Sequence, residues 1–322
     1  MPETPAHQMP DWPWYGVEAD VLPAVGHWHA CGLRVALATL VHVEGSSPRP
    51  LGSEMAIAET GACVGYVSGG CVEAAVVQTA LECLESGSPV LLDYGAGSPV
   101  LDLQLSCGGR IHIFVRQLPN IPGFLAEQHA ARSRRREATV LTDLSTGSWQ
   151  IRPGKQDSSP GVFAQVVPIP LRLVVVGADP VALAVAKQAS QAGFEVEMVR
   201  PHGPVSRPPH LTLAGYHAGA LETALANLVV DGRTAVYAFT HDDAIDHAVL
   251  AFALDNHAFA AGALGSRRKT GGRIGRLLDD GFSADAVNAL FLPAGVKAPA
   301  ATAPRQIATT IVAQLLAAAP GG

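Results

Sequence analysis

Short apolar runs alternate with helical segments in the C-terminal half of the chain, and this alternation constrains the fold more than any other feature. The runs expected to be strands span residues 171–176, 194–199, 234–239 and 258–261. A helix is predicted between the first two runs, over residues 180–191, and Gly193 follows its end. Strands that alternate with helices form a parallel sheet that helices cover. We therefore predict an α/β unit with a parallel sheet, closed by a helix over residues 305–318.

The N-terminal half has a different pattern of strands and one strongly amphipathic helix. Strands are predicted at residues 33–43, 54–58, 63–67, 90–92 and 110–115, and a first helix lies within residues 16–30. The helix that opens at or just after Cys71 has a face of Val72, Val76, Ala80, Cys83 and Leu84, and Gly87 is its expected stop. The segment after Pro119 is predicted to be one helix followed by short strands. The expected domains are a tail (1–15), a first α/β domain (16–118), a connecting subdomain (119–168) and the parallel-sheet domain (169–322).

Composition excludes several classes of protein. The net charge of −6 and the pI near 6.0 argue against nucleic-acid binding, and the basic run at residues 132–136 is interpreted as a solvated helix end. Residues 1–14 have no basic and apolar regions typical of a signal peptide, and no run approaches the ~20 apolar residues of a membrane span. The five cysteines form no CxxC pair. This pattern indicates free thiols in the reducing cytoplasm.

Ser68-Gly69-Gly70-Cys71 joins a predicted strand to the amphipathic helix. Consecutive glycines allow backbone N–H groups to converge on an anion, and the start of a helix favours a thiolate. Glu73 is an anion in the same first turn and opposes this effect a little. A thiolate is a ligand that soft transition metals prefer. The alternative is that Cys71 is a small buried hydrophobic residue, as many free cysteines are.

Two further loops carry candidate ligand-binding groups. Cys107-Gly108-Gly109-Arg110 again places a thiol beside bare backbone, and Arg110 is positioned either to pair with an anion or to point along its strand. The loop at residues 45–50 presents two hydroxyls, Ser46 and Ser47, and the Arg49 guanidinium between prolines. Hydroxyls and a guanidinium can bind a phosphate or the edge of a pterin.

These loops together resemble a known family. Residues 39–52, Ser68–Glu73 and Cys107–Arg110 resemble the N-terminal domain of the XdhC/CoxI family, and residues 240–242 and 262–268 resemble its C-terminal Rossmann-like domain. The resemblance covers most of the chain outside the tail and the connecting subdomain. It implies an N-terminal XdhC/CoxI-type α/β domain followed by a Rossmann-like parallel-sheet domain.

The resemblance also implies a function. Members of this family bind molybdenum cofactor, protect it, and cooperate with a cysteine desulfurase that installs its sulfido ligand. They then deliver it to an apo molybdenum hydroxylase of the xanthine dehydrogenase type. Carried over to this chain, Cys71 is the first candidate to contact molybdenum or carry sulfur, and Cys107 is the second. The other candidate cofactor-binding residues are Ser46, Ser47, Arg49, Ser68, Gly69, Gly70, Glu73, Gly108, Gly109, Gly177, His241, Gly265, Ser266 and Arg267.

The C-terminal domain departs from a dinucleotide-binding fingerprint. Only Gly177 of the three expected glycines is present, and Asp179 places a negative side chain where a pyrophosphate would approach. Arg200 follows the second strand in place of the usual acidic residue. A lone arginine there leaves open the binding of a 2′-phosphate, but taken together with Asp179 it argues against NAD(P) binding.

Small residues and cations at residues 262–268 suit a terminal phosphate at a strand–helix junction. Thr240 and Asp242 lie at the preceding junction, where either is also a typical helix N-cap.

Three functions remain open at this point. The first is a molybdenum cofactor chaperone, a binding protein that need not turn over a substrate. The second is an NAD(P)-dependent oxidoreductase that uses the Rossmann-like domain. The third is a docking protein that bridges the sulfurase and the apo-enzyme without holding cofactor. A surface rich in Ala and Gly further predicts a homodimer.

Overall fold

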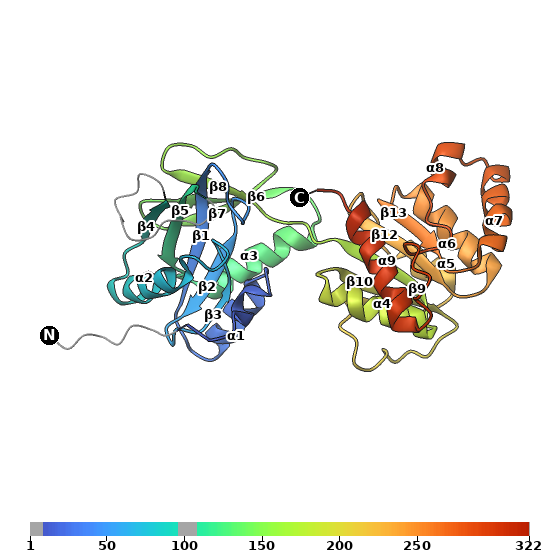
Figure 1. Cartoon of the computed structure of the whole chain (residues 1–322), viewed down its shortest axis with the longest axis horizontal. Coiled ribbons are helices and arrows are strands. Elements are labelled where there is room, and N and C mark those ends of the chain that lie inside the picture. The colour runs from blue at the N-terminus through green and yellow to red at the C-terminus, as the bar shows by residue number, and fades with distance from the viewer. Residues whose placement is uncertain (1–8, 96–107, 322) are drawn as a thin grey trace. The chain divides into compact units, whose positions relative to one another are not determined.

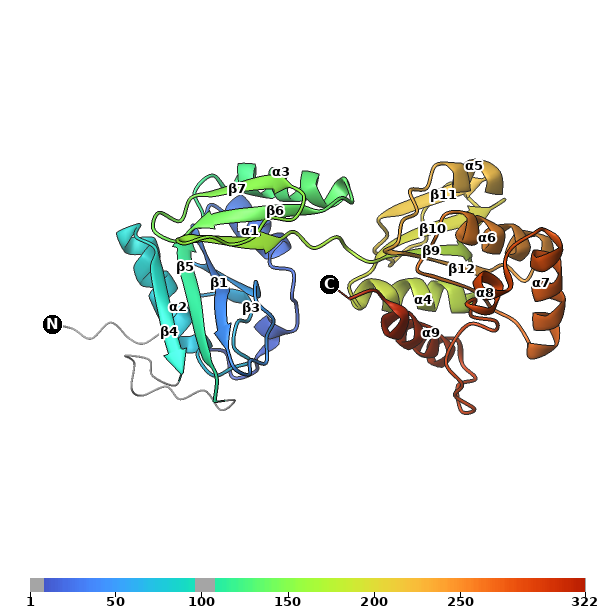
Figure 2. The same ribbon diagram turned by 90° about the horizontal axis from the view of Figure 1, so that it is seen from above.

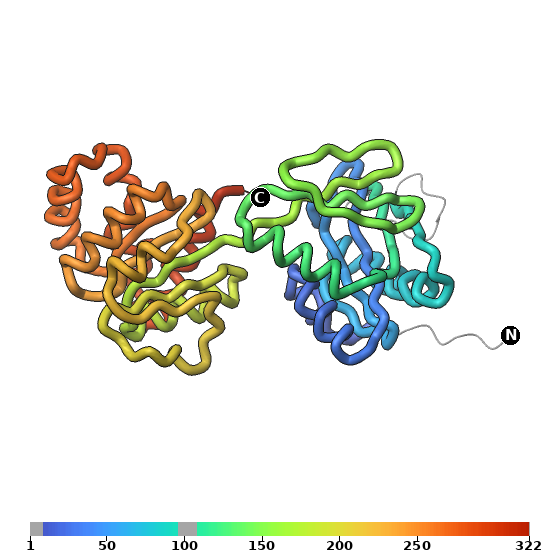
Figure 3. The backbone as a smooth tube through the Cα atoms, turned by 180° about the vertical axis from the view of Figure 1, so that it is seen from behind, coloured from blue at the N-terminus to red at the C-terminus, as the bar shows by residue number. Residues whose placement is uncertain are grey.

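The computed structural model describes residues 9–95 and 108–321. The chain divides into two compact units, Met1–Pro168 and Ile169–Gly322 (Figure 1). Figure 3 traces the backbone of both units in chain order. Each unit has its own sheet and its own hydrophobic core.

The first unit is built on a five-stranded antiparallel sheet in the order β3-β2-β1-β5-β4. Its strands are β1 (Val35–Glu44), β2 (Glu54–Ala58), β3 (Cys63–Gly65), β4 (Val90–Gly95) and β5 (Arg110–Gln117). Successive side chains of a strand point to opposite faces. Ile111, Ile113 and Val115 of β5 therefore share one face, and each is at most 1% exposed. The strands predicted in this half are confirmed.

Helix α2 (Glu73–Ser86) covers that face of the sheet and packs on it through the predicted apolar stripe. Cys83 lies in this core, as predicted. The helix ends where Gly87 takes a left-handed conformation with φ of 72°, which glycine adopts without a Cβ penalty. The predicted stop is confirmed.

Helices α1 (Leu22–Ala30) and α3 (Ile121–Ser133) pack on the opposite face of the sheet (Figure 2). Val25, Leu37 and Phe124 meet there in one buried cluster. A short 3-10 helix, η1 (Trp14–Gly16), precedes α1 and contacts β3.

The first unit also contains a three-stranded antiparallel sheet, in the order β7-β6-β8. Its strands are β6 (Ala138–Asp143), β7 (Trp149–Pro153) and β8 (Val162–Val166). The prediction of one helix followed by short strands is confirmed. The side chain of Gln165 on β8 donates to the Gly52 carbonyl at 2.8 Å, so this sheet is tied to the larger one.

The second unit has a five-stranded parallel sheet in the order β11-β10-β9-β12-β13. Its strands are β9 (Arg172–Gly177), β10 (Glu195–Pro201), β11 (Gly215–Gly219), β12 (Thr234–Phe239) and β13 (Ala260–Ala263). Both faces of a parallel sheet are covered, so its central strands are apolar throughout. Residues 173–176 are accordingly 0% exposed. The predicted Rossmann-like sheet is confirmed.

Helices cover both faces of this sheet. One core cluster joins α4 (Pro180–Gln191) and α9 (Pro304–Ala318) to the sheet, and a second joins α5 (Leu221–Ala226), α6 (Asp243–Asp255), α7 (Arg267–Asp279) and α8 (Ala284–Asn288). Our prediction missed β11, because Gly-Tyr-His-Ala-Gly contains no apolar run. Across residues 9–95 and 108–321, none of the helices combines the length and apolar character needed to span a membrane.

Candidate functional site

The turn between β3 and α2 displays Cys71 at the surface. Gly69 and Gly70 have φ of 91° and 106°, a region that favours glycine, and they turn the chain before the helix begins at Glu73. The alternative that Cys71 is a buried hydrophobic residue is wrong, because its side chain is exposed.

Glu73 points into this turn. Its side chain is buried, with the residue 1% exposed. Within the described residues its carboxylate accepts five hydrogen bonds, from the backbone N–H groups of Val67, Ser68, Gly70 and Val72 and from the Ser68 hydroxyl, at 2.7–3.2 Å. The N–H groups that we expected to converge on a ligand therefore converge on Glu73. The physical reason is proximity: a buried carboxylate in the first helical turn reaches the same amides.

The loop at residues 45–50 lies against the Cys71 turn. A Cβ on Gly69 would lie 3.1 Å from Pro48 Cγ. The Arg49 guanidinium stacks 4.3 Å from the centre of the Tyr66 ring, and Tyr66 lies just before the turn. Arg49 Nη1 is also 3.4 Å from Tyr66 Oη. Stacking on an aromatic ring fixes the plane of a guanidinium. Arg49 is therefore held beside the Cys71 turn.

The same loop also contacts the third predicted motif. A Cβ on Gly109 would collide with the Ser46 carbonyl oxygen, so only glycine fits this approach. Gly108 is exposed, and Cys107 lies outside the described residues. The loop at residues 45–50 thus touches both glycine motifs, and three motifs far apart in sequence meet in one place.

A polar cluster on β1, β4 and β5 adjoins this loop and was missed from the sequence. Arg110 makes a bidentate ion pair with Asp93, with distances of 2.9 and 2.5 Å, so it pairs within the protein. This hydrogen-bonded guanidinium lowers the pKa of the Asp93 carboxyl. The His42 and His112 rings lie 4.8 Å apart, and burial lowers the pKa of His112. Alternating polar residues at the end of β1 and the start of β5 were the available signal.

The other cysteines differ from Cys71 in setting. Burial raises the pKa of the Cys63 thiol to about 11, and the charge of Glu73 adds to the effect. Cys83 is in the core, and Cys31 is exposed at the end of α1. The described residues contain no group of three His, Cys, Asp or Glu side chains arranged to hold a metal ion.

In the second unit, Asp179 closes the turn between β9 and α4. Asp179 Oδ1 accepts a hydrogen bond from the Ala182 N–H at 2.6 Å, and Oδ2 lies 3.0 Å from His241 Nε2. Gly177 is explained by packing, because a Cβ there would lie 2.5 Å from the Phe239 carbonyl oxygen of β12. Close packing of β9 against β12 therefore requires a glycine here, and contact of Gly177 with a cofactor stays a prediction.

The β12–α6 and β13–α7 junctions of this sheet adjoin a buried ion pair. Asp242 caps α6 by accepting from the Ala244 and Ile245 N–H groups, which is the N-cap role that we left open. Arg273 of α7 pairs with Asp246 of α6 at 2.5 Å, and both are at most 5% exposed as side chains.

Gly265, Ser266 and Arg267 are exposed at the start of α7, where the Ser266 side chain makes no cap bond. They and the pair of His241 with Asp179 line the carboxyl edge of the sheet, where ligands of such folds bind.

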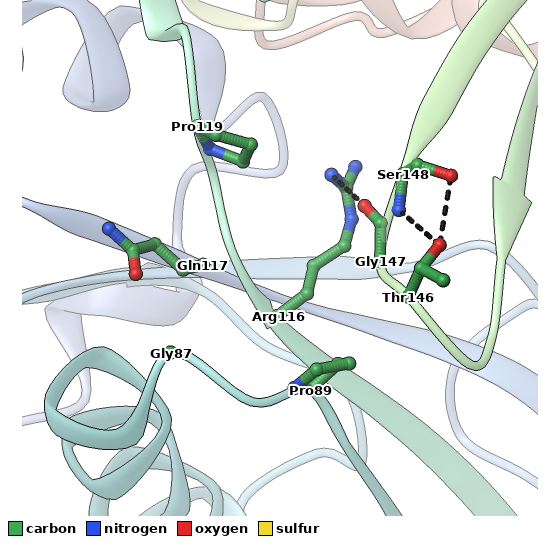
Figure 4. A pocket seen from close by; sticks show the side chains of 8 residues that line it. All are labelled: Gly87, Pro89, Arg116, Gln117, Pro119, Thr146, Gly147 and Ser148. Atoms are coloured by element: carbon green, nitrogen blue, oxygen red, sulfur yellow. Dashed lines mark hydrogen bonds between the residues drawn. The ribbon is translucent and has the colours of Figure 1, made fainter.

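A hollow of about 270 Å³ lies elsewhere in the first unit, between the end of α2, β5 and the β6–β7 turn (Figure 4). Its lining residues are Gly87, Pro89, Arg116, Gln117, Pro119, Thr146, Gly147 and Ser148. Arg116 is 3% exposed and donates to the Gly147 carbonyl at 3.2 Å. None of the predicted cofactor-binding residues lines this hollow.

Comparison with known proteins agrees with the geometry of both units. Models of the XdhC and CoxI family and of the XdhC Rossmann domain match residues 28–95 and 173–315. The chain is 30% identical to the molybdenum cofactor insertion chaperone PaoD of Escherichia coli K12, over 88% of this chain and 83% of the relative. It is 24% identical to a probable xanthine dehydrogenase subunit of Bacillus subtilis 168, over 87% of this chain and 92% of the relative.

A crystal structure described as a xanthine dehydrogenase from Bacillus halodurans has the same fold. Its TM-score is 0.74 at 22% identity, and the match covers 92% of this chain and 95% of the other. The family-model matches and the 30% identical relative together establish the assignment. The chain belongs to the XdhC and CoxI family.

Proposed function

We propose that this protein binds molybdenum cofactor and delivers it to an apo molybdenum hydroxylase of the xanthine dehydrogenase type. The relatives named a molybdenum cofactor insertion chaperone and a probable xanthine dehydrogenase subunit support this proposal. The observation that carries it is the exposed thiol of Cys71 at the place where the loop of residues 45–50 meets two glycine turns.

Cys71 would contact the molybdenum or carry sulfur to it, since a thiolate is a soft ligand and a nucleophile. Ser46, Ser47 and Arg49 would hold the pterin or its phosphate, because their loop lies against the Cys71 turn at Pro48 and Gly69. The exposed Gly108 has no side chain and would allow the cofactor to approach the backbone closely. Cys107 is the second thiol candidate.

The second unit offers a candidate phosphate site of its own. Gly265, Ser266 and Arg267 offer backbone donors and a cation at the start of α7, which suits a terminal phosphate. His241 is exposed at the next junction, although Asp179 already engages it. The α4 junction is filled by the Asp179 carboxylate, so we assign no phosphate to it.

The proposed partners are a cysteine desulfurase and the apo-hydroxylase, and the protein would act as a homodimer in the cytoplasm. Sulfuration of the cofactor would take place while the cofactor is bound. Binding to both partners without any bound pterin would instead support the docking function.

The test is cofactor binding by purified protein. Wild-type protein incubated with molybdopterin and passed through a desalting column should retain about one pterin per chain, measured by fluorescence after oxidation. Cys71→Ala should lower this at least about ten-fold, since loss of a metal ligand or its support typically costs that much. Cys31→Ala is the matched control, because Cys31 is exposed far from the loops, at the end of α1. Full binding by a Cys71→Ala/Cys107→Ala double variant would rule out the thiol mechanism.

A further inference from the structure

We propose that Glu73 is a positioning residue, whose buried carboxylate binds the backbone N–H groups of Val67, Ser68, Gly70 and Val72 and so presents the Cys71 thiol outward. The inference rests on the proposed function for its purpose, since it concerns the thiol that would meet the cofactor.

The first argument is the hydrogen bonding around Cys71. Gly70 and Val72, the residues on either side, both donate their N–H groups to one oxygen of Glu73, at 2.9 and 3.2 Å. The Ser68 hydroxyl donates to the same oxygen at 2.7 Å and accepts from the Cys71 N–H at 3.1 Å. The backbone on both sides of the thiol is therefore fixed by a single carboxylate and one hydroxyl.

The second argument is the chemistry of the acceptor. Both Glu73 oxygens receive donors, because Oε1 accepts from the Val67 and Ser68 N–H groups at 3.2 and 2.8 Å. An amide side chain has one acceptor oxygen and one NH₂ group. Glu73→Gln would therefore set NH₂ against at least two donors in either orientation. A carboxylate, with two acceptor oxygens, matches this set of donors.

The third argument is that four backbone N–H groups of the turn, those of Val67, Ser68, Gly70 and Val72, already bind Glu73. The donors converge on Glu73 from inside the turn, and Glu73 is 1% exposed while Cys71 is exposed. The turn therefore contributes a thiol to the surface, and the binding of a phosphate would fall to other residues. This separates the role of Glu73 from that of a cofactor ligand.

The test measures thiol reactivity without any cofactor. Full-length wild type, Glu73→Gln and Glu82→Gln are treated with iodoacetamide, and mass spectrometry follows each cysteine separately. Glu82 is exposed on the same helix, so its variant loses an equal charge. In Glu73→Gln, we expect Cys71 to react at least about three-fold more slowly relative to Cys31, because the loosened turn no longer holds the thiol outward. Loss of the neighbouring negative charge alone would make Cys71 react faster, so a slower reaction reports on positioning. Buried Cys83 should stay protected, which shows that the unit is still folded.

The second measurement is molybdopterin retention by the same variants. We expect Glu73→Gln to retain about ten-fold less, and Glu82→Gln to match wild type. Unchanged or faster Cys71 reactivity in a folded Glu73→Gln protein overturns the positioning role. If the reactivity falls while wild type retains no pterin, the positioning role stands and the proposed function fails.

Should Glu73→Gln also expose Cys83, Ser68→Ala replaces it in both measurements. This variant removes only the hydroxyl that accepts from the Cys71 and Val72 N–H groups. A slower Cys71 in Ser68→Ala with Cys83 protected supports the inference, and an unchanged or faster Cys71 overturns it.

Discussion

Two strand–turn–helix junctions, one in each unit, hold a carboxylate of the chain itself at the start of a helix. At the β3–α2 junction Glu73 lies inside the turn, and the exposed side is left to Cys71. At the β9–α4 junction Asp179 caps the helix and reaches His241, so the carboxylate stands where a dinucleotide would place its pyrophosphate. A carboxylate at the start of a helix therefore leaves a thiol exposed in one unit and occupies a possible ligand position in the other.

The largest expected effect comes from removing the buried carboxylate. Glu73→Ala leaves several buried donors without an acceptor, and we expect it to lower the free energy of unfolding of the first unit by about 3 kcal/mol. All four tryptophans lie between residues 12 and 149, so tryptophan fluorescence during urea unfolding reports on this unit alone. Glu82→Ala should cost less than about 0.5 kcal/mol. Equal losses of unfolding free energy in Glu73→Ala and Glu82→Ala would show that the hydrogen bonds of Glu73 do not stabilise the unit.

The next prediction concerns Glu54, a second carboxylate of the first unit. Burial raises the pKa of Glu54 from 4.5 to about 7, against the charge of Arg116 on β5, the hydrogen bond of Gln165 on β8 and the charge of Arg132 on α3, while Asp20 raises it further. The folded pKa of Glu54 lies above the unfolded one, so protonated Glu54 favours the folded state. Its contribution to the free energy of unfolding is fully present below pH ~4.5 and is lost as pH rises through about 7.

Glu54→Gln should remove that loss. One pKa unit corresponds to about 1.4 kcal/mol and residual exposure of Glu54 screens part of it, so we expect the variant to gain roughly 2 kcal/mol over wild type at pH 8. The measurement is urea unfolding at pH 4.5, 6 and 8. If the free energies of unfolding of variant and wild type change in parallel with pH, Glu54 ionises as readily in the folded protein as in the unfolded chain.

A smaller loss is expected at the junction of the second unit. Asp179→Ala removes an N-cap and should cost about 1 kcal/mol, because the pair with His241 is largely solvated and adds little. Hydrogen exchange of the first turn of α4 measures this directly. A cost as large as that of Glu73→Ala would erase the difference between the junctions.

The smallest expected effect is none at all. Because the Asp179 carboxylate takes up the α4 junction, calorimetric titration of wild type with NADH or NADPH should give no binding heat. Micromolar binding of either nucleotide would restore the oxidoreductase function and reverse our interpretation of Asp179.

Much of the fold was predictable because it depends on local pattern. The apolar runs of β9 and β12 and the stop at Gly87 are signals that a single segment carries. The candidate site was only partly predictable. The sequence identified the loops that meet, but the inward direction of Glu73 depends on the glycine torsions of its turn. The cluster of Asp93, Arg110 and His112 depends on the register between β4 and β5, which no single segment contains.

The contact between Gly109 and the Ser46 carbonyl has a consequence for engineering the site. In a saturation library, position 109 should accept glycine alone, since any larger residue meets the backbone of the facing loop. At its neighbour Gly108, where φ is 70°, an added Cβ would have no heavy atom of the described residues within 4 Å, so asparagine should survive selection there. The two adjacent glycines would thus tolerate different sets of amino acids, and position 108 is the one at which a labelled residue can be introduced.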